Sequence, residues 1–453
     1  MEKTMSDIFK SYDIRGLYPQ QINRAVANLL GQAIAKFFLQ AGQTKTVVIG
    51  GDMRMSTPEL RDGIILGLVA QGMKVWDLGL VSTDTVYYAS GRYSMPGIMI
   101  TASHNPAEYN GCKIVLAGAV GVGSDSGLPM IEQYYLALQE DYNSEHSLAV
   151  EDKRQILTEY LDYLKRFINP ADFQKMRLVI DAGNGLAGKI IPLLLENSPL
   201  DIIPLYFELD GSFPNHEANP LKPENTSDLI KRVKLENADL GLAFDGDSDR
   251  VFFIDEQGRL IDSSYIICLV AQYLLNKYPA QKILYNAVCS RVVPEVISGF
   301  GGQPVMERVG HTFIKNKMRQ EDIIFGGEKS GHYYYRDCFY ADNAFLTVLI
   351  VLSIMTQESG KTFSQLIEKF QTSSILPETN FTVDDQKKII TKLKNIYHDG
   401  EQSELDGLSV YYPEWWFNVR LSGTEPLLRL NLEAADDNLL QKKLAELSQL
   451  IME

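Results

Sequence analysis

The stretch Gly-Ile-Met-Ile-Thr-Ala-Ser-His-Asn-Pro, residues 97–106, joins an apolar run directly to a polar segment with a serine beside a histidine. The apolar run predicts a buried strand, and the Asn-Pro pair favours a turn. Ser103 therefore stands at the end of a strand, where backbone amides can cradle a phosphate group. An ordinary strand-to-helix turn with a surface serine is the alternative. Lys113, in the following Asn-Gly-Cys-Lys segment, adds a possible cationic contact.

Short apolar runs of this kind alternate with amphipathic helical patterns along the chain, which is typical of α/β layers with mostly parallel strands. We expect strands at residues 46–50, 74–78, 97–100, 177–181, 201–207, 240–244, 282–285, 304–308, 323–325, 417–421 and 427–432. We expect helices near residues 21–40, 57–71, 185–196, 226–236, 291–299, 342–356 and 436–451.

The 453 residues are enough for two to four domains, at roughly 100–200 residues each. A polar stretch at 121–126 and a charged one at 140–154 suggest a first boundary, after which the pattern of strands and helices restarts. A third set of elements is expected to run from Val251. The predicted fold is three similar mixed α/β domains plus a smaller C-terminal α+β domain, with boundaries that give 1–150, 151–250, 251–371 and 372–453.

The composition restricts the class of partner. With 43 basic and 58 acidic residues the net charge is −15, so nonspecific binding to nucleic acid or a membrane surface is not expected. The first seven residues lack the apolar stretch of a secretory signal, and the longest apolar segment, 344–355, is too short for a membrane span of about 20 residues. Four scattered cysteines without a CxxC pair fit a reducing cytoplasm.

An acidic hexapeptide, Asp-Gly-Asp-Ser-Asp-Arg at residues 245–250, follows the apolar run 240–244. Carboxylates at alternate positions of a tight loop can converge on one hard cation. Asp245, Asp247, Asp249 and Glu256 also fit an EF-hand spacing, but Arg250 stands where that loop needs glycine, and the flanks are predicted strands. We therefore favour a Mg²⁺ site over an EF-hand. A solvated acidic loop is the remaining alternative.

Three glycines at positions 183, 185 and 188 give a GxGxxG pattern directly after a predicted strand, with Glu208 further on. This pattern is found in dinucleotide-binding proteins and would make the chain an NAD(P)-binding oxidoreductase. The same glycines also occur where the backbone must turn and pack closely. We rank the oxidoreductase lower, because it would leave the serine loop unexplained.

The glycine-flanked segment 327–332 offers an acceptor, a hydroxyl and a titratable donor within five residues, in Glu328, Ser330 and His332. Sugar hydroxyls require this mixture of donors and acceptors, and His311 upstream could add another donor. A plain glycine-rich connector is the alternative.

The segment 420–426, Arg-Leu-Ser-Gly-Thr-Glu-Pro, combines a guanidinium, two hydroxyls and backbone amides on a turn. Such a group can clamp a phosphate. The residues that would take part are Arg420, Ser422, Gly423 and Thr424, with Arg429 on the next strand. A surface turn is the alternative.

Taken in order, these four clusters resemble the α-D-phosphohexomutase family, within it the bacterial phosphomannomutase/phosphoglucomutase group. The resemblance runs nearly end to end and includes the opening sequence from Ile8 to Gly16. It implies four domains around a central cleft, each contributing one loop, and it explains the glycines at 183–188 as a structural turn.

The resemblance also implies residue roles. It implies a phosphoserine at Ser103 and Mg²⁺ ligands from Ser103, Asp245, Asp247 and Asp249. It places in catalysis Ser103, His104, Lys113, Arg250 and His332. It places in substrate binding Tyr12, Arg15, His311, Glu328, Ser330, Arg420, Ser422, Gly423, Thr424 and Arg429.

The activity implied is interconversion of hexose 1-phosphate and hexose 6-phosphate, of mannose and/or glucose, through a phosphoserine enzyme and a hexose 1,6-bisphosphate intermediate. One Mg²⁺ per chain is expected, with hexose 1,6-bisphosphate as activator and intermediate. The expected partners are small-molecule sugar phosphates, and the expected state is a monomer or weak homodimer. A phosphoglucosamine mutase of the same family is the alternative. Lys329 stands where dual-specificity relatives carry Met, and Val288 stands where some carry Lys.

Overall fold

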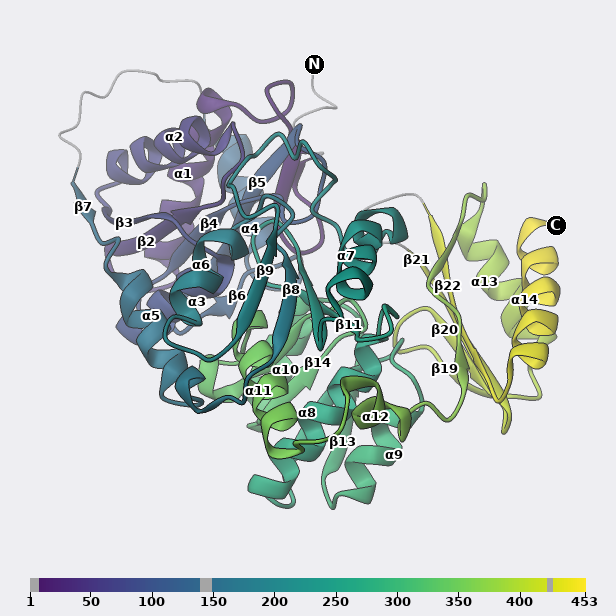
Figure 1. The fold of residues 1–453 in the computed structure, drawn as a ribbon. Coiled ribbons are helices and arrows are strands. Elements are labelled where there is room, and N and C mark those ends of the chain that lie inside the picture. Colours follow the sequence, from purple (N-terminus) through teal and green to yellow (C-terminus); the bar gives the residue numbers. More distant parts are fainter. Residues whose placement is uncertain (1–7, 139–148, 422–426) are drawn as a thin grey trace.

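The computed structural model describes residues 8–138, 149–421 and 427–453, and these residues form four β-sheets with their helices (Figure 1). Each expected strand and helix overlaps an observed one. The fold class predicted from the sequence is confirmed: three mixed α/β units are followed by a smaller C-terminal unit.

The first sheet has seven strands in the order β1-β5-β4-β2-β3-β7, with β6 paired to β5. Strands β2, β3, β4 and β7 are parallel, whereas β5 is antiparallel to β1, β4 and β6. Its elements are β1 (Ile14–Leu17), α1 (Arg24–Gln40), β2 (Thr46–Gly51), α2 (Thr57–Ala70), β3 (Lys74–Leu80), α3 (Thr83–Tyr93), β4 (Gly97–Ile100), β5 (Tyr109–Leu116), β6 (Val120–Gly121), α4 (Leu128–Ala137) and β7 (Val150–Asp152).

The second sheet has the order β11-β10-β8-β9. Its elements are α5 (Ile156–Lys165), β8 (Arg177–Asp181), α6 (Ala187–Leu194), β9 (Asp201–Leu205), α7 (Pro223–Glu236), β10 (Leu240–Phe244) and β11 (Val251–Asp255). The expectation that Val251 opens a third set of elements is wrong for this strand. Leu240 pairs with Asp255, so β11 returns antiparallel along β10 and closes the second sheet. The acidic segment 245–250 is the turn of that hairpin.

The third sheet has the order β13-β12-β14-β15-β16. Its elements are α8 (Ser263–Lys277), β12 (Lys282–Asn286), α9 (Val292–Gly299), β13 (Gln303–Glu307), α10 (His311–Glu321), β14 (Phe325–Gly327), β15 (Tyr333–Tyr335), β16 (Ala341–Asp342), α11 (Ala344–Gln357) and α12 (Phe363–Glu368). Helix α11 is apolar all round and buried, as a helix packed between layers must be. Among the described residues, no helix combines the length and apolar content that crossing a membrane requires.

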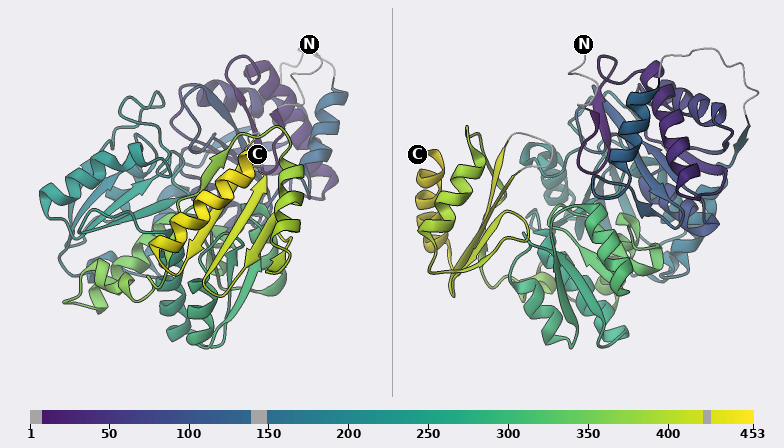
Figure 2. Two further views of the ribbon diagram at one scale, coloured as in Figure 1. Left: turned by 90° about the vertical axis from the view of Figure 1, so that its right-hand side faces the viewer. Right: turned by 180° about the vertical axis from the view of Figure 1, so that it is seen from behind.

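The fourth sheet is antiparallel throughout. The helices α13 and α14 cover the face turned away from the other sheets (Figure 2). Its elements are β17 (Ser374–Ile375), β18 (Thr379–Phe381), α13 (Gln386–Ile396), β19 (Glu401–Ser403), β20 (Leu408–Tyr411), β21 (Trp415–Leu421), β22 (Leu428–Ala434) and α14 (Asp437–Met452). This unit has its own hydrophobic core, whereas one continuous buried cluster runs through the other three units.

Candidate active site

Ser103 lies in the loop between β4 and β5, with its side chain directed at the second sheet. Its hydroxyl donates a hydrogen bond to Asp245 Oδ2 at 2.8 Å and accepts one from Arg250 Nη2 at 2.9 Å. The residue is buried and has a left-handed backbone with φ of 52°, a conformation that non-glycine residues adopt only when their surroundings hold them there. The serine loop of one unit and the acidic loop of the next therefore meet at this hydroxyl.

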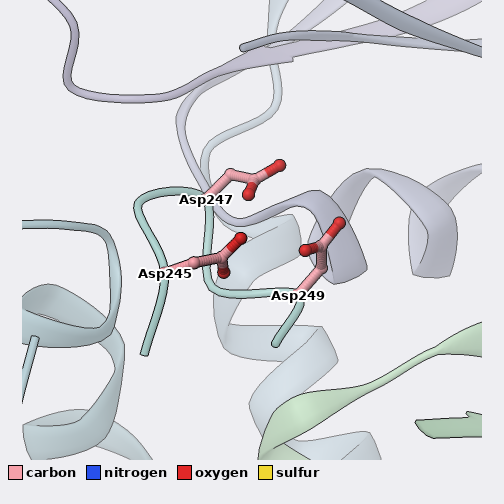
Figure 3. A group of neighbouring side chains, drawn as sticks. All are labelled: Asp245, Asp247 and Asp249. Carbon is pink, nitrogen blue, oxygen red and sulfur yellow. The ribbon is translucent and has the colours of Figure 1, made fainter. Parts of the chain in front are cut away.

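The acidic loop brings three carboxylates together (Figure 3). One oxygen from each of Asp245, Asp247 and Asp249 lies within 4.8 Å of the others, and all three residues are buried. Asp247 Oδ1 is buried without a hydrogen-bond donor, and Asp249 Oδ1, also buried, has His332 Nε2 only at the long distance of 3.5 Å. Unsatisfied buried carboxylate oxygens are costly, and they are the ligands that Mg²⁺ prefers. The donor set therefore fits a hard divalent cation, with Ser103 Oγ adjacent.

Two cations from the protein neutralise part of this negative charge. Lys113 Nζ donates to Asp247 Oδ2 at 2.7 Å and also contacts Asp249 Oδ2, and Arg250 Nε donates to Asp245 Oδ2 at 3.0 Å. Burial alone would lower the pKa of Lys113, but the charges of Asp247 and Asp249 outweigh it and raise that pKa well above its ordinary value. The two ion pairs therefore favour the charged form of Lys113 beside the acidic loop.

The three carboxylates differ in their proton affinity. Burial raises the pKa of Asp245 to about 7, against the opposing effect of Arg250. Burial acts in the same direction on Asp247 and Asp249, yet Lys113 outweighs it, helped by Thr83 at Asp247 and by His332 at Asp249, and the pKa of both falls. The carboxylate nearest the serine hydroxyl is thus the most easily protonated of the three.

Three histidines predicted for the site surround these loops. His104 Nδ1 lies 3.3 Å from Ser103 Oγ and also contacts Arg250 Nη2; burial, followed by the charge of Arg250, lowers its pKa well below the ordinary value. His332 Nε2 lies 3.5 Å from Asp249 Oδ1. Burial lowers the pKa of His311 as well, so the imidazoles of His104 and His311 are neutral.

The segment 327–332 forms a tight turn between β14 and β15. The Glu328 carboxylate is buried and accepts from Asn286 Nδ2 at 3.2 Å, from Gly310 N at 3.3 Å and from the Tyr334 hydroxyl. Ser330 Oγ lies 3.0 Å from His332 Nδ1. Glu328 is thus oriented by three protein donors.

Tyr12 and Arg15, from the opening sequence, lie beside these loops. The Tyr12 hydroxyl donates to the Val309 carbonyl oxygen at 3.2 Å, and its ring packs against His311 with centroids 5.7 Å apart. Burial, followed by the charge of Glu328, raises the pKa of Tyr12 to about 12. Arg15 Nη1 donates to Asn105 Oδ1 at 2.6 Å, next to Ser103.

The two arginines of the predicted clamp face each other across β21 and β22, where Arg420 pairs with Arg429. Glu378 lies between them and accepts from Arg420 Nη2 and from Arg429 Nη1, each at 2.9 Å. Arg420 is buried, and its charge opposes the rise in the pKa of Tyr12. The fourth unit therefore lies near the other loops of the site. Ser422, Gly423 and Thr424 lie outside the described residues.

Other parts of the backbone pack closely against the glycine turn at 183–188, which leads from β8 into α6. A Cβ on Gly185 would lie 2.8 Å from the carbonyl oxygen of Gly246, and one on Gly188 would lie 2.1 Å from that of Phe207. Leu186 N donates to the Gly246 carbonyl oxygen at 3.0 Å. The turn therefore supports the acidic loop, which accounts for its glycines without a dinucleotide.

Several residues of the site were missed by sequence reasoning. Thr83 Oγ1 donates to Asp247 Oδ2 at 2.6 Å from the start of α3, and Asn286 and Tyr334 hold Glu328. Asp52 and Arg54 hold the serine loop from behind. Only Asp52 carried a usable signal, as a carboxylate that follows an apolar strand in the same way as Asp245 does.

Family models match most of the chain. Those described as phosphoglucomutase/phosphomannomutase, alpha/beta/alpha domains I, II and III, match residues 6–141, 158–258 and 262–373, and the C-terminal domain matches residues 378–450.

Relatives agree along the full length. "Phosphohexose mutases" from Xanthomonas campestris pv. campestris is 39% identical over 98% of each chain, and a phosphomannomutase from Vibrio cholerae is 38% identical over 98% of each chain. The crystal structure of a phosphoglucomutase/phosphomannomutase family protein from Burkholderia thailandensis matches with a TM-score of 0.86 at 30% identity, over 98% of this chain and 96% of that one. The chain belongs to the phosphoglucomutase/phosphomannomutase family, the α-D-phosphohexomutases.

Proposed function

We propose that this phosphohexomutase interconverts hexose 1-phosphate and hexose 6-phosphate, with mannose and/or glucose as the sugar, and that Ser103 carries the phosphoryl group. The observation that carries the proposal is the Ser103 hydroxyl, held at 2.8 Å from Asp245 and at 2.9 Å from Arg250 beside three clustered carboxylates. Relatives named phosphomannomutase and phosphomannomutase/phosphoglucomutase support the choice of sugar.

In the proposed cycle, the bond between Ser103 Oγ and phosphorus breaks as a sugar hydroxyl oxygen bonds to phosphorus. The sugar hydroxyl would give its proton to a base of the site, for which His332 beside Asp249 is the candidate, and Ser103 Oγ would take up a proton and become the free hydroxyl. The product is a hexose 1,6-bisphosphate, which reorients and returns its other phosphoryl group to Ser103 Oγ. Arg250 Nη2 donates to Oγ and would stabilise the negative charge that grows there as the bond to phosphorus breaks. Lys113, paired with Asp247 and Asp249, would place a positive charge beside the phosphoryl group.

Asp245, Asp247, Asp249 and Ser103 Oγ would hold one Mg²⁺, because their buried oxygens form a suitable donor set. When bound, the cation would neutralise charge on the phosphoryl group being transferred. Lys113 and Arg250 already pair with the three carboxylates, which leaves one excess negative charge to attract it.

The remaining residues would recognise the rest of the substrate. Glu328 and Ser330 would bind sugar hydroxyls, with His311, His332, Tyr12 and Arg15 around them. Arg420 and Arg429, with Ser422, Gly423 and Thr424, would hold the phosphate that is not being transferred. The phosphate on C1 and the phosphate on C6 must each occupy this clamp in turn. The clamp must therefore bind phosphate equally well at either carbon.

Two measurements test the proposal. Steady-state assays with glucose, mannose and glucosamine 1-phosphates should show the highest kcat/KM for glucose or mannose, and intact-mass spectra should show one phosphate on Ser103. A preference for glucosamine 1-phosphate would select the alternative within the family. Turnover without any phosphoenzyme would overturn the proposed chemistry.

We also expect a cytoplasmic monomer or weak homodimer that binds neither nucleic acid nor membranes. The net charge of −15 and four buried free cysteines support this expectation. Sedimentation velocity across micromolar concentrations tests the oligomeric state, and a stable higher oligomer would contradict it.

A further inference from the structure

Arg54 lies between β2 and α2 and is almost completely buried. Its guanidinium donates to four backbone carbonyl oxygens, three in the serine loop (residues 101–108) and one at the start of β5. Nη2 donates to those of Ser103 at 2.8 Å and Asn105 at 2.6 Å, and Nη1 donates to those of Pro106 at 2.7 Å and Tyr109 at 2.9 Å. We propose that Arg54 is a positioning residue that fixes the backbone of this loop for phosphoryl transfer, a role that rests on Ser103 as the carrier.

A carboxylate orients this arginine and reaches the serine by a second route. Asp52 accepts from Arg54 Nε at 3.2 Å, from Thr57 Oγ1 at 2.7 Å and from Thr101 Oγ1 at 2.7 Å. Thr101 Oγ1 in turn accepts from Ser103 N at 2.8 Å. The backbone of Ser103 is therefore held at its carbonyl oxygen by Arg54 and at its amide by the threonine.

The donor count explains why arginine is needed. A guanidinium has five N–H donors in a rigid planar fork, and Arg54 uses one at Asp52 and four at these carbonyls. A lysine ammonium has three donors at a single point and cannot span acceptors on both sides of the loop. Substitution by lysine keeps the charge and removes the fork.

The second unit covers the arginine from outside. The Phe213 ring stacks over the guanidinium, 5.1 Å from centroid to Cζ, and the backbone at Gly211 approaches so closely that a Cβ there would lie 2.4 Å from Arg54 Cα. On the other side of the loop, a Cβ on Gly246 would lie 2.8 Å from the Ser103 carbonyl oxygen. Arg54 therefore fixes the serine loop against the acidic loop of the second sheet.

This geometry predicts an effect on turnover and not on binding. Arg54 donates to the loop backbone and not to Ser103 Oγ, so its loss would let the left-handed backbone at Ser103 relax and move the hydroxyl away from Asp245. A displacement of about 1 Å at a reacting atom can cost about a hundredfold in rate. Substrate contacts proposed in the third and fourth units would be unchanged, and only Arg15 touches the loop, at Asn105, so KM should change much less than kcat.

The experiment compares Arg54→Lys with Arg319→Lys. Arg319 is a matched control, because its Nη2 donates to two backbone carbonyl oxygens, those of Gly118 and Phe339, away from the serine loop. We expect Arg54→Lys to fold, to lose about a hundredfold in kcat and in the single-turnover rate of phosphoryl transfer from phospho-Ser103, and to keep KM within about threefold. Arg319→Lys should keep wild-type kcat. A folded Arg54→Lys with kcat within about threefold of wild type overturns the proposal.

A second variant serves if Arg54→Lys does not fold. Thr101→Val removes the acceptor of the Ser103 amide and is expected to lose about tenfold in kcat at unchanged KM. Unchanged kcat in folded Thr101→Val would also count against positioning through the backbone. The proposed function has a separate test: if Ser103→Ala stays active, the carrier assignment itself fails, whatever Arg54 does.

Discussion

The Ser103 hydroxyl and the Asp245 carboxylate lie 2.8 Å apart although 142 positions separate them in the chain. The serine belongs to the loop after β4 of the first sheet, and the aspartate begins the hairpin turn of the second. Their contact exists only because the two units pack through a shared hydrophobic core. The reacting group and the charges that act on it are therefore adjusted by the packing of two units, and not by either loop alone.

Replacing Ser103 tests the carrier directly. Ser103→Ala should lose roughly three orders of magnitude or more in kcat, because the variant lacks the oxygen that would carry the phosphoryl group. Intact-mass spectra should show the phosphate on wild type and not on the variant. The variant should still unfold cooperatively, with a melting temperature lowered by the loss of two buried hydrogen bonds. Ser298→Ala, at an exposed serine in α9, is the matched control. Near-normal turnover by Ser103→Ala would exclude a phosphoserine intermediate.

Removal of metal should stop turnover without unfolding the protein. Lys113 and Arg250 already pair with the acidic loop, so the chelated protein keeps most of its charge compensation. Asp247→Asn should lower kcat more than it raises KM, and half-maximal activity should require more Mg²⁺ than in wild type. Asp172→Asn, at an exposed position, is the control. Full activity after exhaustive chelation would contradict a catalytic metal.

Loss of the clamp arginine should affect both substrates equally. A charge-assisted contact contributes about 1.5–3 kcal/mol, so Arg420→Ala should lose roughly ten- to a hundredfold in kcat/KM for hexose 1-phosphates and 6-phosphates alike. Arg177, exposed at the start of β8, provides the control. An effect on one substrate only would mean that the clamp distinguishes the two ends of the sugar.

The pair of His216 and Asp181 should make stability depend on pH. Burial lowers the pKa of His216, but the hydrogen bond at 3.0 Å and the charge of Asp181 outweigh it, so the folded-state pKa is raised. The protonated pair is therefore stabilising below about pH 6.5, and the contribution is lost as pH rises through the folded-state pKa. The melting temperature of wild type should exceed that of His216→Gln by more at about pH 5.5 than at pH 8. A difference that is equal at both pH values would contradict this assignment.

A buried carboxylate joins the third and fourth units. Glu433 in β22 accepts from Ser290 Oγ at 2.9 Å, from Arg291 N at 3.1 Å, from Trp416 Nε1 at 2.7 Å and from Ser373 Oγ. Glu433→Gln would point an amide N–H₂ group at these donors, at a cost of about 1–3 kcal/mol. Limited proteolysis should then cut faster near residues 371–378, between the two units. An unchanged cleavage rate would show that other contacts hold the fourth unit in place.

Strands formed by apolar runs were predictable from the sequence, including the antiparallel β21 and β22, but antiparallel strands of the mixed sheets and their partners were not. An apolar run such as 97–100 is buried on both faces and stands out from its neighbours, whereas β5 contains Asn110, Gly111 and Lys113 and was not predicted as a strand. The run 251–255 was recognised as a strand, but its sheet was assigned wrongly. The short turn at 245–250 decides that assignment, because it forces the chain back along β10.

Some residues of the candidate site could be predicted from sequence motifs, and others could be recognised only from the packing. Ser103 and the three aspartates follow strands in compact motifs, so their residue types and spacing could be recognised. Arg54 and Glu378 lie in no motif: each becomes part of the site only when segments about 50 residues apart are brought together. Such residues are found from packing, since a single buried arginine or a linker glutamate has no signature along the chain.

Glu378 has a consequence for how an anion enters the fourth unit. Its carboxylate forms an ion pair with both Arg420 and Arg429, so each guanidinium group already has a counter-ion. If the two arginines bind phosphate as proposed, the phosphate would exchange with Glu378, or share the arginines with it, as a counter-ion that is covalently part of the chain. Binding of this kind depends less steeply on ionic strength than capture by two free cations, and small inorganic anions gain little from it. A sugar phosphate, held elsewhere by its ring, is favoured over the simple anions that surround it in much greater number.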